Sequence, residues 1–245
     1  MGKEASEIVL MVPTVADGET TKYHLMGQNS KIISCYITQV VNRIQEQGLE
    51  CYKIHSVTEY ADGSSADEIS IVQIEEGPIP VSTHRVVRSK DGTSLTDSKL
   101  VFKNSAVEIP SNPVLSGVDG LSFCLRGCTF AHKKKIEVNS MCVEGTVLRM
   151  HGTVSKDKIS VPAGTFECYK IEMAAELMET MGYKTPPGMG AIMDHFMPTN
   201  CYWFTQDEPH YLVKFEGCAL SSVAAVHRLP DEGEQALQEL IEIMQ

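Results

Sequence analysis

The same five residues, ECYKI, occur twice in this chain, as Glu50–Ile54 within GLECYKIH and as Glu167–Ile171 within TFECYKIE. Each copy alternates between two kinds of side chain and is preceded by turn residues, a pattern typical of a β-strand. Each copy also leads into a further strand, a proline-containing turn and one more strand. This shared order predicts a scaffold of two similar β modules, at about residues 15–110 and 135–220.

Strand patterns dominate the rest of the chain and are separated by turn residues such as Ala-Asp-Gly and Lys-Asp-Gly. Many strands at short spacing favour a mainly β, meandering antiparallel sheet over alternating strands and helices. The predicted strands are Lys31–Gln45, Leu49–Tyr60, Glu68–Glu75, Val81–Ser89, Lys99–Lys103, Lys135–Met141, Glu144–Val154, Phe166–Met173, Cys201–Thr205 and Tyr211–Gly217.

Three segments carry helical patterns. Residues 118–127 begin with the capping residue Asp119 and end at Gly127, and they are expected to form a helix that links the two modules. A helix is also expected over Met173–Met181, followed by a Pro-Pro-Gly break and a short helical segment. Leu237, Leu240, Ile241 and Met244 form an apolar stripe that predicts a C-terminal amphipathic helix over 231–245. The domain prediction is thus one β domain over 1–230, followed by this helix.

Composition excludes several classes of protein. The formal charge of −11 would repel a phosphate backbone, so nucleic acid is not expected as the main partner. No segment approaches the ~20 apolar residues of a membrane span, and the N-terminus has too short an apolar run for a secretory signal. The eight cysteines mostly lie within alternating apolar stretches and are expected to be reduced. These features predict a cytoplasmic protein.

Several runs resemble an uncharacterised bacterial family, a domain of unknown function. The runs are VDGLSFCLRG, GTVSKDKISVPAGTFECYKIE and YWFTQDEPHYLVKFEG, together with the opening GETTKYHLMGQ that carries Gly18, Glu19 and Tyr23. The resemblance implies a strongly curved antiparallel sheet, or open half-barrel, wrapped round a helix. This architecture is similar to the lipoprotein carriers LolA and LolB, whose concave face holds acyl chains. The resemblance supplies no catalytic residues.

The insertion over 173–200 holds six of the twelve methionines. Methionine is flexible and suits surfaces that adapt to varied apolar partners, so the insertion is a candidate lid over a concave pocket. The alternatives are that these residues cap the sheet or form a homodimer interface. The methionines proposed to contact a ligand are Met178, Met181, Met189, Met193 and Met197.

Other residues are candidates for contact with a ligand. Arg126 and His151 could bind a carboxylate or phosphate head group, and Tyr202 and Trp203 could wall the pocket. The leading functional hypothesis is therefore that a hydrophobic or amphipathic small molecule binds in the concave face, with no cofactor.

Acid–base chemistry in the same pocket is the alternative hypothesis, as in a cofactor-independent isomerase, cyclase, lyase or hydrolase. Its candidates are His195 and Asp194 in the insertion, and Lys170 and Glu172 on the second ECYKI strand. A third hypothesis is a structural protein that associates through the insertion and the C-terminal helix. No phosphate-binding glycine loop or nucleophile elbow is present.

Cys124 and Cys128 follow a helical spacing with His132, a pattern that could hold a metal. Because the two cysteines share a face with Leu121 and Leu125, burial is the favoured interpretation and no metal is expected. One question about the repeat remains open at this stage: whether its Cys–Lys face looks into a cavity or away from it.

Overall fold

The computed structural model describes residues 10–29, 31–75, 77–102, 113–115, 118–130, 135–141, 147–175, 199–217 and 236–244. Within these ranges the strands join into one curved, open sheet in the order β6-β5-β4-β3-β2-β1-β13-β12-β11-β10-β9-β8-β7. The prediction of a mainly β protein with a curved antiparallel sheet is confirmed. The described strands of both predicted modules belong to this single sheet.

Two successive meanders make up the sheet. The first meander contains β1 (Glu19–Gly27), β2 (Ile33–Glu46), β3 (Leu49–Tyr60), β4 (Ser65–Gln73), β5 (Ile79–Arg88) and β6 (Ser94–Val101). The second meander contains β8 (Lys135–Met141), β9 (Val147–Val161), β10 (Gly164–Ala175), β11 (Asn200–Thr205), β12 (Leu212–Gly217) and β13 (Ala236–Met244). ECYKI lies on the third strand of each meander, β3 and β10. The repeat therefore marks equivalent strands.

Hairpin chemistry explains the local order of the first meander. The turn between β2 and β3 consists of Gln47 and Gly48, whose φ angles are 53° and 81°. Two successive positive φ angles match the right-handed twist of a tight hairpin. This turn fixes the register of the first ECYKI copy.

The C-terminal segment corrects the sequence analysis. The predicted helix over 231–245 is wrong, because Ala236–Met244 form strand β13, which pairs with β1 on one side and β12 on the other. β13 joins the two meanders, and without it each would end in an unpaired strand at the centre of the sheet. β1 pairs along most of this nine-residue strand and β12 pairs with Ala236–Glu239, so that stretch has backbone partners on both edges. That gain outweighs a local helical preference.

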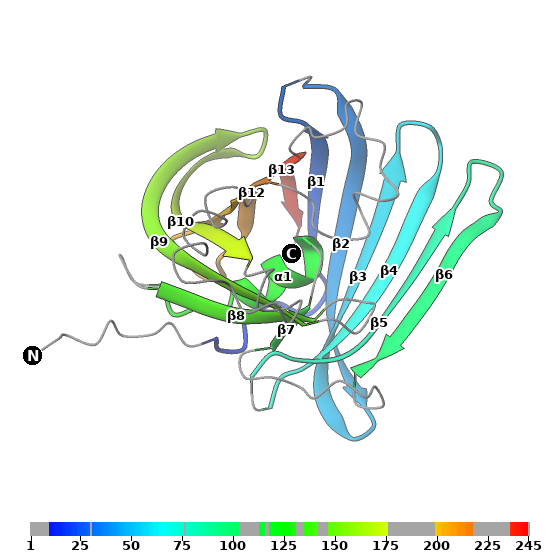
Figure 1. The fold of residues 1–245 in the computed structure, drawn as a ribbon, viewed down its shortest axis with the longest axis horizontal. Helices are drawn as coiled ribbons and strands as arrows, with labels where there is room; N and C mark the ends of the chain where they lie inside the picture. Colours follow the sequence, from blue (N-terminus) through cyan, green and yellow to red (C-terminus); the bar gives the residue numbers. More distant parts are fainter. Residues whose placement is uncertain are drawn as a thin grey trace, which may run out of the picture.

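The sheet wraps round α1 (Val118–Leu125), which lies inside the curve (Figure 1). This helix agrees with the one predicted over 118–127. β7 (Pro113–Leu115) precedes it and pairs with β8 in parallel. The largest buried cluster includes Leu121, Phe123, Cys124 and Leu125 of the helix together with inward-facing residues of both meanders. The concave side thus holds the core.

The predicted lid falls largely outside the described residues. Met173–Ala175, assigned to a helix from the sequence, are instead the last residues of β10, and Met173 is buried in the core. The other residues proposed for the lid, with the two acid–base candidates in it, lie outside the described residues. These are Met178, Met181, Met189, Met193, Met197, Asp194 and His195.

Candidate ligand-binding site

The two faces of the ECYKI strands have different surroundings. Tyr169 and Ile171 of β10 belong to the concave core, as do Tyr52 and Ile54 of β3. Because side chains alternate across a strand, the Cys–Lys side of each copy faces outward. Cys168 accordingly packs in a separate buried cluster on the convex side of the sheet. The cysteine and lysine side chains of ECYKI therefore lie on the convex face of the sheet and not on its concave face.

Trp203 of β11 is the centre of that convex cluster, where it packs with Cys168 and Val213. The ammonium groups of Lys170 and Lys214 lie 5.2 and 5.1 Å from the centroid of its ring, within the range of cation–π attraction. Lys170 also donates to Glu172 at 2.5 Å. The structure therefore places Trp203, Lys170 and Glu172 on the outer face, away from the concave pocket expected for them.

Ionisation in the convex cluster follows these contacts. The indole Nε1 of Trp203 donates to Asp157 at 2.8 Å, and this bond lowers the pKa of the Asp157 carboxyl. Burial alone would lower the pKa of Lys170, but the hydrogen bond to Glu172 and nearby negative charge raise it. The groups are thus held charged and paired. We therefore interpret the convex cluster around Trp203 as a structural feature of the outer surface.

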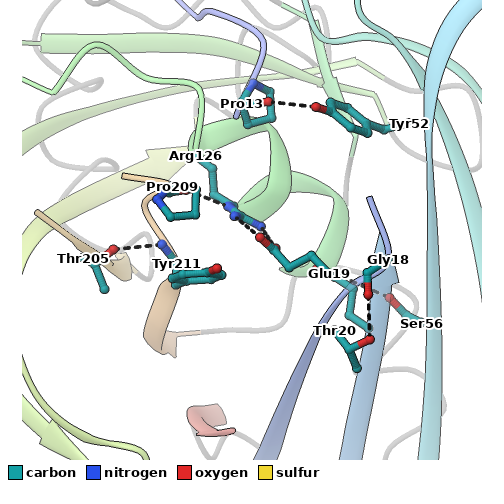
Figure 2. Close-up of polar contacts among 11 residues, drawn as sticks. Pro13, Gly18, Glu19, Thr20, Tyr52, Ser56, Arg126, Thr205, Pro209 and Tyr211 are labelled. Atoms are coloured by element: carbon teal, nitrogen blue, oxygen red, sulfur yellow. Dashed lines mark hydrogen bonds and ion pairs between the residues drawn. The ribbon is translucent and has the colours of Figure 1, made fainter. Parts of the chain in front are cut away.

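Arg126, the expected head-group contact, is already paired. Its guanidinium donates to both carboxylate oxygens of Glu19, at 2.6 and 3.2 Å, and its Nε donates to the Pro209 carbonyl at 3.1 Å. Figure 2 shows Arg126 between these two partners, with the ring of Tyr211 beside it. Glu19 is 1% exposed and Arg126 is 6% exposed. Arg126 therefore ties α1 to both meanders, and its charge is cancelled by Glu19.

The remaining two predicted contacts also lie away from an open pocket. His151 alternates along β9 with Met150 and Gly152, which are buried on the concave side, so His151 faces outward. Tyr202 faces inward but is fully buried against Phe215, with ring centroids 5.0 Å apart. Burial raises the pKa of its hydroxyl. Tyr202 is part of the core and does not line the cavity described next.

A cavity of about 320 Å³ opens beyond the C-terminal end of α1. Four segments that are distant in sequence enclose it: the chain before β1, the residues after α1, strand β10 and the loop between β11 and β12. The lining residues are Met11, Val12, Pro13, Thr14, Arg126, Gly127, Cys128, Thr129, Phe130, Tyr169, Glu208, Pro209 and His210.

The first wall of the cavity depends on a glycine. The Met11 amide donates to the Gly127 carbonyl at 2.8 Å, which holds the chain before β1 against the end of the helix. A Cβ atom on residue 127 would lie 1.7 Å from the Met11 carbonyl oxygen. Gly127, predicted from the sequence only as a helix stop, is thus required for this close approach.

Aromatic rings form the second wall. Phe130 stacks on Tyr169, with ring centroids 4.9 Å apart and planes 11° apart. His210 meets the Phe130 ring edge to face, at 4.8 Å and 85°. Such a wall offers flat apolar surface with polar atoms at its margin, which is typical of small-molecule sites.

His210, like Phe130 and Tyr169, was not predicted from the sequence as a site residue. Its backbone is left-handed, with φ of 54°, and its Nδ1 lies 2.8 Å from the Thr205 carbonyl oxygen. The Thr205 hydroxyl donates to the Asp207 carbonyl and accepts from the Tyr211 amide, so the loop is internally bonded. The Asp-Glu-Pro-His run predicted a turn, and its left-handed histidine places a ring in the cavity.

The helix cysteines are buried, as expected. Burial raises the pKa of the Cys124 thiol to about 12 and raises that of Cys128 further, which disfavours the thiolate that binds metals. Among the described residues, no group of three His, Cys, Asp or Glu side chains is arranged to hold a metal ion. In that same part of the chain, no helix has the length and apolar character needed to cross a membrane.

Comparisons with known proteins place the fold only loosely. No protein-family model and no curated protein matches the chain. A "putative lipoprotein" from Parabacteroides distasonis ATCC 8503 is 11% identical, with coverage of 94% of this chain and 96% of that one and a TM-score of 0.36. A "putative exported protein with YmcC-like fold" from Bacteroides fragilis NCTC 9343 is 10% identical, with coverage of 97% and 100% and a TM-score of 0.37. At TM-scores this low, no residue role is carried across.

One prediction changes in view of these two proteins. The sequence predicted a cytoplasmic protein, whereas the two similar structures are described as a lipoprotein and an exported protein. We therefore withdraw the cytoplasmic prediction.

Proposed function

We propose that this protein binds a small amphipathic molecule in the cavity beyond α1. The observation that carries the proposal is the aromatic wall of Phe130, Tyr169 and His210 along a cavity of about 320 Å³. Ligand pockets commonly span roughly 300–1,000 Å³ and combine apolar lining with a few polar groups. The volume favours a compact ligand over a long acyl chain.

The geometry supports binding better than catalysis. Of the four acid–base candidates, Lys170 and Glu172 pair with each other on the outer face, and Asp194 and His195 lie outside the described residues. A catalytic base must reach the proton that it removes, and neither Lys170 nor Glu172 lies at the cavity. Among the residues that the structure describes, none of the predicted acid–base candidates therefore lies at the cavity to support the enzyme hypothesis.

Association through a C-terminal helix also loses support. The residues concerned form β13 in the centre of the sheet, where β1 pairs with one edge and β12 pairs with Ala236–Glu239 on the other. A homodimer formed through another surface stays a prediction.

Native mass spectrometry of the purified protein tests the proposal. We expect a co-purifying small molecule that is retained by Tyr36→Ala and lost from Tyr169→Ala. The two variants remove the same side chain, but Tyr36 is 50% exposed on β2 and does not line the cavity. Equal retention by both variants would contradict binding at this site.

A further inference from the structure

His210 lines the cavity and has one ring nitrogen that can accept a hydrogen bond. Since its Nδ1 lies 2.8 Å from the Thr205 carbonyl oxygen, which can only accept, the neutral ring carries its proton on Nδ1. That leaves the lone pair on Nε2, which has no hydrogen-bond partner among the described residues. A ligand must therefore donate a hydrogen bond in order to pair with this atom.

Charges around the cavity disfavour an anion. Among the described lining residues the only arginine or lysine is Arg126, and its charge is neutralised by the bidentate pair with buried Glu19. Glu208 adds an exposed carboxylate to the lining. Lys156 lies 5.8 Å from the ring of Tyr169 but does not line the cavity. Within the described lining, a ligand carboxylate or phosphate would thus lose water without gaining an unpaired arginine or lysine as counter-ion.

A cationic head group is also less suitable than a neutral one. An ammonium group leaving water needs a paired charge close by, and the one carboxylate among the described lining residues, Glu208, is exposed to solvent. A hydroxyl group needs no counter-ion and can donate directly to a neutral imidazole.

We propose that the ligand carries an uncharged hydroxyl group that donates to Nε2 of His210, and that its flat apolar part lies along Phe130 and Tyr169. This inference rests on the proposed function and names its ligand class. It also replaces the earlier expectation of an anionic head group held by Arg126. Three observations support the proposal: the tautomer of His210, the pairing of Arg126 with Glu19, and the aromatic wall of the cavity.

Isothermal titration calorimetry tests this inference with three matched probes. The probes are para-ethylbenzyl alcohol, para-ethylbenzylamine and para-ethylbenzoate. We expect the alcohol to bind most tightly. The dissociation constant of the benzoate should be at least about tenfold higher than that of the alcohol, because an unpaired buried charge is costly. Equal or tighter binding of the benzoate would overturn the inference. Absence of binding by all three would overturn the proposed function as well.

Variants of His210 separate the two proposals. Asn readily adopts a left-handed backbone, so His210→Asn keeps the loop geometry and shortens the side chain. We expect it to weaken alcohol binding about threefold to tenfold through one lost hydrogen bond. His84→Asn on β5, where the exposed ring pairs with Asp97, is the matched control and should leave binding unchanged. His210→Gly, which also permits φ of 54°, gives a second test. If the probes bind but neither His210 variant changes their affinity, the hydroxyl contact is wrong while the cavity site stands.

Discussion

The two copies of ECYKI have the same sequence and occupy the third strand of each meander, yet their tyrosines have different roles. Tyr52 is 1% exposed, packs edge to face on Phe123 of α1 at 5.5 Å, and donates to the Pro13 carbonyl. Tyr169 is only half-buried, stacks on Phe130 and lines the cavity. The first copy closes the core and the second opens onto a candidate site.

The difference comes from what lies opposite each strand. The helix itself packs against β3, whereas β10 faces the residues that follow the helix. Gly127 lets the chain before β1 lie against the end of the helix, and both line the cavity there. A duplicated strand can thus serve packing in one half and binding in the other without any change in its own residues.

The largest expected effect comes from breaking the contact that joins both meanders to α1. We expect Arg126→Ala to lower the free energy of unfolding by about 3–5 kcal/mol, because it leaves the Glu19 carboxylate buried and unpaired. Chemical denaturation measures the change. Lys22→Ala removes an exposed pair with Glu242 and should cost less than about 1 kcal/mol. A similar small cost for Arg126→Ala would show that the pair is not buried.

The two tyrosines give the sharpest test of the comparison itself. We expect Tyr52→Ala to lower the free energy of unfolding by about 3–5 kcal/mol, as is usual for a fully buried aromatic residue. Tyr169→Ala should cost about 1–2 kcal/mol, since half-burial gives less apolar area to lose. Urea denaturation of both variants checks this order. Equal losses would mean that the second copy is as closed as the first.

A smaller effect distinguishes two buried glutamines on the concave side. Gln238 of β13 is 1% exposed and neither amide atom has a hydrogen-bond partner among the described residues, whereas Gln39 of β2 donates to Ser56 at 3.3 Å. Gln238→Leu should therefore raise the free energy of unfolding by about 1 kcal/mol, seen as a higher melting temperature, and Gln39→Leu should lower both. A loss of stability in Gln238→Leu would indicate that its amide is satisfied.

The smallest effect concerns pH and the outer cluster. The Trp203 indole lowers the pKa of Asp157 below its ordinary value of 3.8. A group whose pKa is lowered on folding stabilises the fold above its unfolded pKa, and this contribution is lost as the pH falls through the folded pKa. The difference in melting temperature between wild type and Asp157→Asn should therefore be present at pH 7 and shrink below about pH 4. A difference that is independent of pH would contradict the charged contact.

Patterns of local sequence were sufficient to predict most strands and the position of α1. They failed at β13, because Leu237, Leu240, Ile241 and Met244 fit a helical stripe, while pairing with β1 and β12 decides the actual structure. Strand β1, in GETTKYHLMG, was also missed as a strand. Its role depends on β13, which is more than 200 residues away in the sequence.

The site was harder to predict for the same reason. Arg126 looked available for a ligand because its partner, Glu19, is 107 residues away. Lys170 and Glu172 looked like pocket residues because alternation defines two faces of a strand but does not say which face is concave. His210 gave no periodic signal, and its place in the cavity follows from a loop that the sequence identified only as a turn.

A crystal structure of the protein with para-ethylbenzyl alcohol tests the central claim most directly. The account predicts that the molecule lies against Phe130 and Tyr169, with its hydroxyl within hydrogen-bond distance of Nε2 of His210. Binding on the convex face beside Trp203, with the cavity left empty at a saturating concentration, would contradict it.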